Sequence, residues 1–231
     1  MRIKLFLVVA TILLCIPRAF SQATPQPTPN VGRSPYDCTE APPSTCPRGR
    51  RAMKVRGPEL TKTYTNYDSG RAITVAEWFK YTCGLNKFVA ADPPADKPIE
   101  GAENVTVTLT GFVLAVKFMR TGDGDMHVEL GDGPNWDEDH VVIEMSPGKD
   151  FCKGRQKLWK LVEKDGCKGD ECILKKPIKV EVTGYMLSGG APQGVTDYCN
   201  YVSPRGLKDD THQPRAKGVW RLQPVLSLKK K

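Results

Sequence analysis

The longest strand-forming segment of the chain runs from Asn104 to Met119 (NVTVTLTGFVLAVKFM), and a single glycine, Gly111, interrupts it. Valine, threonine and phenylalanine favour extended backbone, and a glycine inside a strand commonly marks a bend or a bulge. One long bent strand can pair within two sheets, which is what the closure of a small barrel requires. The segment therefore predicts a mainly β fold organised around this strand.

Four further strands are expected after it, because short apolar or β-branched runs recur between turn-forming residues. The five expected strands span residues 104–119, 125–130, 141–145, 177–187 and 219–228. Between the third and the fourth, Asp150–Lys164 predicts a helix with an apolar side, and Gly166 provides its stop. A long loop, residues 188–218, precedes the last strand.

The order strand, strand, strand, helix, strand, strand is that of an OB-fold, a five-stranded, partly open barrel with its helix between strands three and four. We therefore expect an OB-fold-like five-stranded barrel over residues 104–231. Barrels of this kind bind ligands on the exposed face of strands two and three and through the adjoining loops. We accordingly expect a binding role rather than catalysis.

Five segments also resemble a group of uncharacterised exported bacterial proteins that contain an OB-like domain. These segments are VTLTGFVLAVKF, DMHVEL, HVVIEMSP, IKVEVTGYML and GVWRLQPVLSL, which together lie within roughly half of the chain. They are similar to the family's glycine-bearing first strand, its Asp-x-His-x-x-Leu strand, its Val-x-Glu strand and its closing strand before Pro-Val. The family pattern often has histidine before that Pro-Val, where this chain has Gln223. The resemblance implies export and an OB-like domain, and it implies no particular activity.

The first residues carry the pattern of a secretory signal peptide. Arg2 and Lys4 form a basic start, and Leu5–Ile16 is an apolar segment too short to span a membrane comfortably. The sequence AFS at residues 19–21 offers a small-x-small cleavage pattern, so we place cleavage after residue 21, with Ala23 as the alternative. No later segment is apolar enough to span a bilayer. A secreted or periplasmic protein is therefore expected.

Residues 22–58 are expected to form a linker, because they are rich in proline and end in the basic run RGRRAMKVRGP. Without residues 1–21, 31 of the 34 Lys and Arg remain against 26 Asp and Glu, a net charge of +5. A basic run is usually a solvated tail, and otherwise a patch for nucleic acid or an anionic surface. An anionic polymer or an envelope component is the partner class that this charge leaves open.

Residues 59–103 are expected to form a short helical lead-in to the barrel. Thr74 and Glu77 match a capping box, while Trp78, Phe79 and Cys83 give the helix an apolar edge. We expect Trp78 to pack this helix onto the main domain.

Seven cysteines remain after removal of the signal peptide: Cys38, Cys46, Cys83, Cys152, Cys167, Cys172 and Cys199. Disulfides are the default expectation for cysteines in an exported protein. Cys38 and Cys46 bracket a proline-rich segment, and Cys167 and Cys172 enclose KGDE. We therefore expect the two local bridges 38–46 and 167–172. The partners of the other three cysteines stay open.

The stretch GDGDMHVELGDG alternates apolar and polar residues, so Asp125, His127 and Glu129 share one face of a strand. It can pair antiparallel with HVVIEM in a register in which partner numbers sum to 271. That register joins apolar residues throughout, as the pairs Met126–Met145, Val128–Ile143 and Leu130–Val141. It also sets His127 directly opposite Glu144, with Asp125 one pleat away.

Two interpretations of this polar face stay open. The first is a half-solvated cross-strand pair of His127 and Glu144, which contributes modestly to stability. The second is a site in which a carboxylate orients an imidazole as metal ligand or general base. Its candidate ligands for a divalent cation are Asp125, His127, Glu144 and His212.

The acidic stretch GDGPNWDEDH, with Asp132, Asp137, Glu138 and Asp139, raises calcium binding as a further possibility. It departs from the EF-hand spacing, which needs a glutamate at the twelfth position of its loop. A solvated hairpin loop is therefore the stronger expectation for this stretch.

The function expected from the sequence is that of an exported binding domain without a cofactor, whose ligand is an oligosaccharide, a nucleic acid or an envelope protein. The alternative is a metal-assisted hydrolase, such as a phosphodiesterase, that uses the four candidate ligands. A structural envelope protein is a third possibility. No nucleophile elbow or Ser–His–Asp order is present, which disfavours a serine hydrolase.

Overall fold

The computed structural model describes residues 34–36, 38, 65–89, 97–119, 124–190, 192–203, 206–209 and 211–231. The predicted signal peptide, Cys46 and the basic run at 48–58 lie outside these residues.

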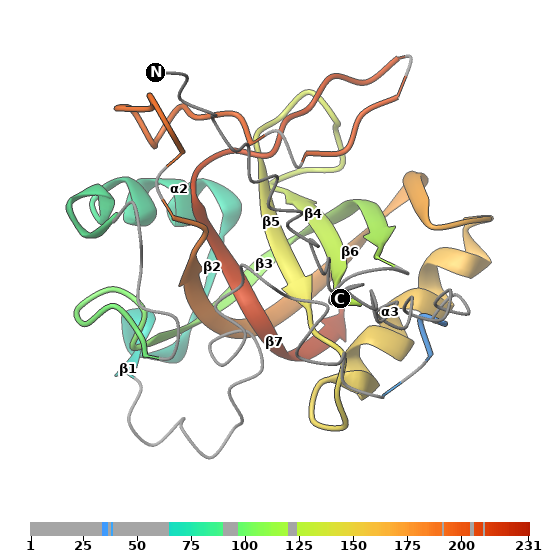
Figure 1. Cartoon of the computed structure of the whole chain (residues 1–231). Coiled ribbons are helices and arrows are strands. Elements are labelled where there is room, and N and C mark those ends of the chain that lie inside the picture. The colour runs from blue at the N-terminus through green and yellow to red at the C-terminus, as the bar shows by residue number, and fades with distance from the viewer. Residues whose placement is uncertain are drawn as a thin grey trace, which may run out of the picture. The chain divides into compact units, whose positions relative to one another are not determined.

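Five strands form a closed ring of hydrogen-bonded pairs in the order β3-β4-β5-β7-β6, with β6 pairing back to β3 (Figure 1). Their bounds are β3 Val105–Phe118, β4 Met126–Gly131, β5 His140–Met145, β6 Glu171–Ser188 and β7 Trp220–Lys230. The pair β5–β7 is parallel, and the other four pairs are antiparallel. The fold is thus mainly β with a mixed sheet, and all five predicted strands are present.

The long strand β3 is irregular, but not where the sequence predicts. Its pairing with both β4 and β6 shifts between Val113 and Ala115, whereas the bend was expected at Gly111. Gly111 has a different role: a Cβ there would lie 2.8 Å from the carbonyl oxygen of Gly131 at the end of β4. The glycine therefore permits a close approach of two backbones rather than a bend.

The predicted lead-in contributes strands to the same sheet, so it is more than a helical extension. β1 (Thr65–Asn66) and β2 (Ala72–Thr74) both pair parallel with β3. The predicted capping box is confirmed: Thr74 and Glu77 cap α2 (Val75–Cys83), and Trp78 in that helix is fully buried. The short 3-10 helices η3 (Tyr67–Gly70) and η4 (Asn86–Phe88) flank these elements.

The helix α3 (Cys152–Lys164) lies between β5 and β6, as predicted, and buries Leu158, Trp159 and Val162. Gly166 follows the helix with a φ of 92°, a conformation that glycine adopts without strain. No helix in the described part of the chain is long and apolar enough to cross a membrane.

The first predicted disulfide is wrong. Cys38 is bonded to Cys152 at the start of α3, with 5.2 Å between the two α-carbons, and not to Cys46. The neighbouring Tyr36 explains this choice, because its hydroxyl donates to Glu163 and its carbonyl accepts a hydrogen bond from Gln156 at 2.8 Å. This part of the predicted linker is therefore packed along α3, which a locally bridged free segment would not be.

The second predicted disulfide is also absent, although its two cysteines meet. Cys167 and Cys172 are thiols joined by a hydrogen bond. Burial, and then the bond to Cys172, raises the pKa of Cys167 to about 12, so this thiol stays protonated at neutral pH. The expected short loop is thus formed without the covalent bond.

Candidate functional site

The hairpin of β4 and β5 has the predicted register. Met126 pairs with Met145, Val128 with Ile143 and Leu130 with Val141, and the six side chains are fully buried in the core. His127 lies opposite Glu144, also as predicted. Asp125, His127, Glu129 and Glu144 therefore share the outer face of the ring.

That outer face is not half-solvated, which corrects the first interpretation of the His127–Glu144 pair. Asp125 and Glu129 are each 1% exposed, and Glu144 is fully buried. Glu129 and Glu144 are covered by the segment between β6 and β7, residues 189–219, which we call the β6–β7 loop, whereas Asp125 bonds to Gln223 of β7. This segment was predicted as a loop, but its sequence does not reveal which face it covers.

Two side chains, Arg221 and His127, contact the carboxylate of Glu144. Its Oε1 accepts a hydrogen bond from Arg221 Nη1 at 2.7 Å and lies 3.4 Å from His127 Nε2. The parallel pairing of Ile143 with Leu222 places Arg221 beside Glu144, because both apolar residues point inward and their neighbours point outward. The His127–Glu144 pair thus becomes part of a buried triad that extends to β7.

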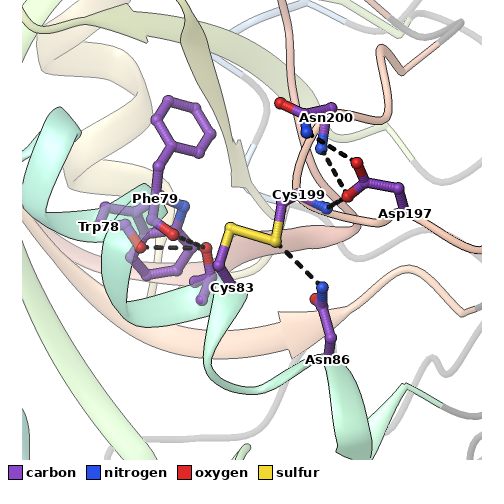
Figure 2. The surroundings of a disulfide bond; sticks show 8 residues. Trp78, Phe79, Cys83, Asn86, Asp197, Cys199 and Asn200 are labelled. Carbon is purple, nitrogen blue, oxygen red and sulfur yellow. Dashed lines mark hydrogen bonds between the residues drawn. A yellow bond between two sulfur atoms is a disulfide. The ribbon is translucent and has the colours of Figure 1, made fainter.

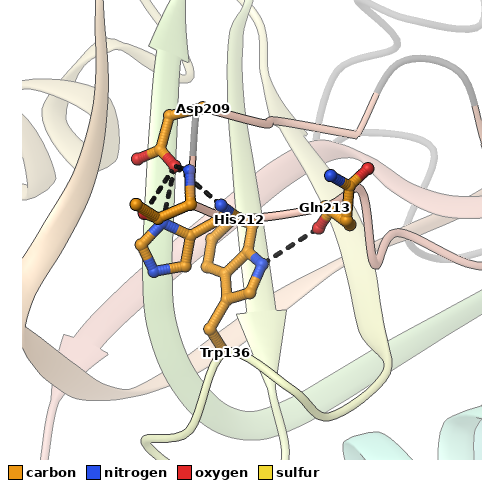
Figure 3. A network of polar contacts seen from close by, with 5 residues as sticks. Trp136, Asp209, His212 and Gln213 are labelled. Atoms are coloured by element: carbon orange, nitrogen blue, oxygen red, sulfur yellow. Dashed lines mark hydrogen bonds and ion pairs between the residues drawn. The ribbon is translucent and has the colours of Figure 1, made fainter.

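The four predicted metal ligands do not come together. Asp125 accepts a hydrogen bond at 2.7 Å from Gln223 of β7. His212 belongs to another cluster, in which its ring contacts Asp209 and packs edge-on against Trp136 (Figure 3). Among the described residues, no group of three His, Cys, Asp or Glu side chains is arranged to hold a metal ion.

The cluster around His212 fixes the outer part of the β6–β7 loop. The backbone N–H of Thr211, followed by the His212 ring, lowers the pKa of Asp209 to about 2. Trp136 donates its indole N–H to the carbonyl of Gln213 at 3.0 Å (Figure 3). These bonds close a turn and attach it to the β4–β5 connection, so they have a structural role.

The acidic stretch between β4 and β5 is an interaction surface within the protein. Asp137 pairs with Arg215 at 3.5 Å and Asp139 with Lys217 at 2.8 Å, both on the β6–β7 loop. Asp132 accepts a hydrogen bond from Ala76 in the first turn of α2, and Glu138 accepts one from Gly133. The carboxylates therefore point to separate partners, which differs from both a calcium loop and a simple solvated turn.

A second buried pair, Glu129 and His140, was not predicted from the sequence. His140 Nδ1 lies 2.7 Å from Glu129 Oε2, and both side chains are almost fully buried. The other oxygen of Glu129 accepts the backbone N–H of Leu207, which fastens the β6–β7 loop to β4. Glu129 lies directly opposite Val142 in the hairpin, so His140 is its diagonal neighbour on β5 and not its direct pairing partner. The register alone therefore does not predict this contact.

The β6–β7 loop is also held by backbone bonds and one disulfide. Lys217 N donates to the carbonyl of His140, and Ser203 N donates to that of Ala216, both at 2.8 Å. Cys83 at the end of α2 is bonded to Cys199 in the loop (Figure 2). Cys199 Sγ also accepts a hydrogen bond at 3.1 Å from Asn86 (Figure 2). The loop is thus anchored at Cys199 by the disulfide and at Ser203 and Lys217 by backbone hydrogen bonds.

A pocket of about 230 Å³ lies between this loop and the outer face of the ring. We call it the Arg221 pocket. Its lining includes Val142 and Glu144 of β5, Arg221 of β7, and Tyr201, Ser203 and Lys217 of the loop. Among the predicted site residues, Glu144 lines this pocket, and His127 contacts Glu144 without being part of the lining.

Three residues of the pocket were not predicted as site residues: Arg221, Lys217 and Tyr201. One clue was present for Arg221: in VWRLQPV it alternates with apolar residues, which places it on the outer face of an expected strand. Nothing comparable identifies Tyr201 or Lys217, because both belong to an irregular segment.

Comparison of the chain with protein-family models, curated proteins and solved structures found no match. The resemblance to exported bacterial proteins is therefore untested, and the candidate site rests on the geometry of this chain.

Proposed function

We propose that this protein is an exported ligand-binding domain with an OB-fold, and that its ligand binds in the Arg221 pocket. We number the five ring strands 1 to 5 in chain order, from β3 to β7. Their order around the ring is then 1-2-3-5-4, and strand 4 pairs back to strand 1. This order, with α3 between strands three and four, supports the fold assignment.

The observation that carries the proposal is the position of the pocket. It lies on the outer face of the third and fifth ring strands and is closed by the loop between the fourth and the fifth. Barrels of the OB type bind their ligands on the outer face near strands two and three and with the loop between strands four and five. The Arg221 pocket combines the same kinds of element.

Export is supported by two independent features. The N-terminal sequence has the basic, apolar and small-residue pattern of a signal peptide. The pairs Cys38–Cys152 and Cys83–Cys199 are disulfides, which form and persist in oxidising compartments.

A thermal-shift screen of the purified protein tests the binding role. The panel contains oligosaccharides, single-stranded oligonucleotides and peptides, the three ligand classes that the sequence leaves open. We expect one class to raise the melting temperature by about 2–4 °C at saturation. Arg221→Gln should abolish the shift, and Arg215→Gln, on the β6–β7 loop but outside the pocket lining, should keep it. A shift that both variants retain would place the ligand outside the pocket.

A further inference from the structure

The charged groups around the Arg221 pocket are neutralised within the protein. Arg221 is paired with Glu144 at 2.7 Å, and Lys217 is paired with Asp139 at 2.8 Å. The Arg221 side chain is 12% exposed and the Glu144 side chain 0%, so this pair is shielded from water. A charged ligand would meet no uncompensated counter-charge there, and its own desolvation would count against binding.

The same pairs retain strong hydrogen-bonding capacity toward an uncharged ligand. A guanidinium has five N–H donors in one plane and an ammonium has three, so one bond to a carboxylate leaves donors over. Hydrogen bonds from ionised groups are shorter and stronger than neutral ones. Hydroxyl groups, which donate and accept, can bond to Arg221 and Lys217 without adding charge to the site.

The remaining lining combines Ser203 and three glycines with apolar and aromatic side chains. Val142, Val219 and Pro192 contribute aliphatic surface, and Tyr201 contributes the aromatic residue of the lining. A sugar ring presents one face of C–H groups to such surface and directs its hydroxyls sideways, so it matches both parts of the pocket. The volume of about 230 Å³ corresponds to about eight water molecules, which suits one ring rather than several.

We propose that the Arg221 pocket binds a single uncharged pyranose unit, as a free sugar or as one residue of a neutral glycan. This inference rests on the proposed binding function and names its ligand class. Phosphate recognition differs, because nucleic acids are bound by cations whose charge is available to the phosphates. In this pocket both lining cations already have carboxylate partners.

Ligand-observed NMR with the purified full secreted chain tests the inference. The probes are the methyl glycosides of glucose, galactose, mannose and N-acetylglucosamine, with glucuronate and glucose 6-phosphate as anionic counterparts. We expect at least one neutral glycoside to bind about tenfold more tightly than either anion. Its affinity should change by less than about twofold between low and high salt, because no net charge is neutralised on binding.

Variants then assign the binding to the pocket. Tyr201→Ala should weaken the neutral glycoside about tenfold, and Tyr201→Phe should change its affinity much less, since the ring is retained. Tyr198→Ala, in the same loop but outside the lining, is the matched control and should leave affinity unchanged. Circular dichroism of each variant verifies that the fold is retained.

Three results would overturn the inference. One is tighter binding of glucuronate or glucose 6-phosphate with a steep salt dependence, which would make the pocket an anion site. Another is glycoside binding that Tyr201→Ala and Tyr198→Ala affect equally. The third is the absence of glycoside binding, and it separates the two proposals: a peptide or oligonucleotide that binds in an Arg221-dependent manner preserves the binding function, whereas no ligand at all removes both.

Discussion

The two faces of the β4–β5 hairpin are built from the same strands and both contain fully buried side chains, but these are buried by different means. The inner face meets apolar residues across the ring, and Val128 and Ile143 there are fully buried. The outer face carries Glu129 and Glu144, which are covered by the β6–β7 loop. Alternation along a strand therefore determines which side a residue takes, and does not determine whether that side meets water.

The two faces also differ in what their burial requires. Apolar burial contributes about 25 cal/mol per Å² and depends little on the identity of the neighbour. A buried carboxylate such as Glu129 is tolerated because particular partners satisfy it, here the N–H of Leu207 and the ring of His140. The burial of the outer face therefore depends on the β6–β7 loop, whereas the burial of the inner face does not.

The largest effect is expected from a charge on the inner face. Val128→Asp should lower the free energy of unfolding by about 4 kcal/mol, because it places an unpaired carboxylate in the core. Urea denaturation measures this value. Val142→Asp is the control, since its half-buried side chain faces the pocket, and it should cost about 1 kcal/mol. Equal costs for the two variants would contradict the assignment of the faces.

Removal of the disulfide in the double variant Cys83→Ser/Cys199→Ser should cost about 3 kcal/mol, the middle of the usual range for a disulfide. The loss should concentrate on the outer face. Hydrogen exchange should accelerate at Leu207 and Gly218 in the β6–β7 loop while Val128 in β4 remains protected. Uniform acceleration across these amides would show that the loop and the ring unfold as one unit.

Glu129→Ala should cost about 2 kcal/mol, because it leaves the buried N–H of Leu207 and the His140 ring without their acceptor. The comparison is Glu171→Ala, which breaks an exposed pair with Lys117 and should cost about 0.5 kcal/mol or less. Chemical denaturation of both variants gives the two values. A Glu129 variant as stable as the Glu171 variant would mean that the loop is not fastened through this carboxylate.

His127→Ala should have the smallest effect, about 1 kcal/mol or less. Glu144 keeps its shorter bond to Arg221 when the imidazole is removed, so its charge stays compensated. Denaturation of His127→Ala beside Arg221→Gln checks this ranking, and the arginine variant should be the less stable of the two. The reverse order would identify His127 as the main partner of Glu144.

The sequence predicted the ring strands and the hairpin register well, for a physical reason. Met126, Val128 and Leu130 meet partners 11 to 19 residues away across one turn, and any register slip would expose them. The capping box of Thr74 and Glu77 was predictable because it is local. These parts of the fold could therefore be predicted from short-range sequence patterns.

The site was less predictable because its parts are distant in sequence. Glu144 and Arg221 are 77 residues apart, and their contact depends on how β7 joins β5. His212 was assigned to the candidate metal site from residue type alone, and the path of the loop takes it to Trp136 instead. The disulfide partners Cys38 and Cys152, 114 residues apart, were missed for the same reason, since short spacing favoured local pairs.

The disulfide Cys83–Cys199 has a further consequence for a chain that a protease has cut. The bridge Cys83–Cys199 spans the exposed turn at 168–170, which precedes β6. A protease that cleaves this turn produces two fragments that remain covalently joined, and each still contributes strands to the ring. The nicked protein should migrate as two bands on a gel after reduction and as one band before it. Proteolysis at this turn would therefore leave the pocket assembled, with Cys199 still fastened to α2.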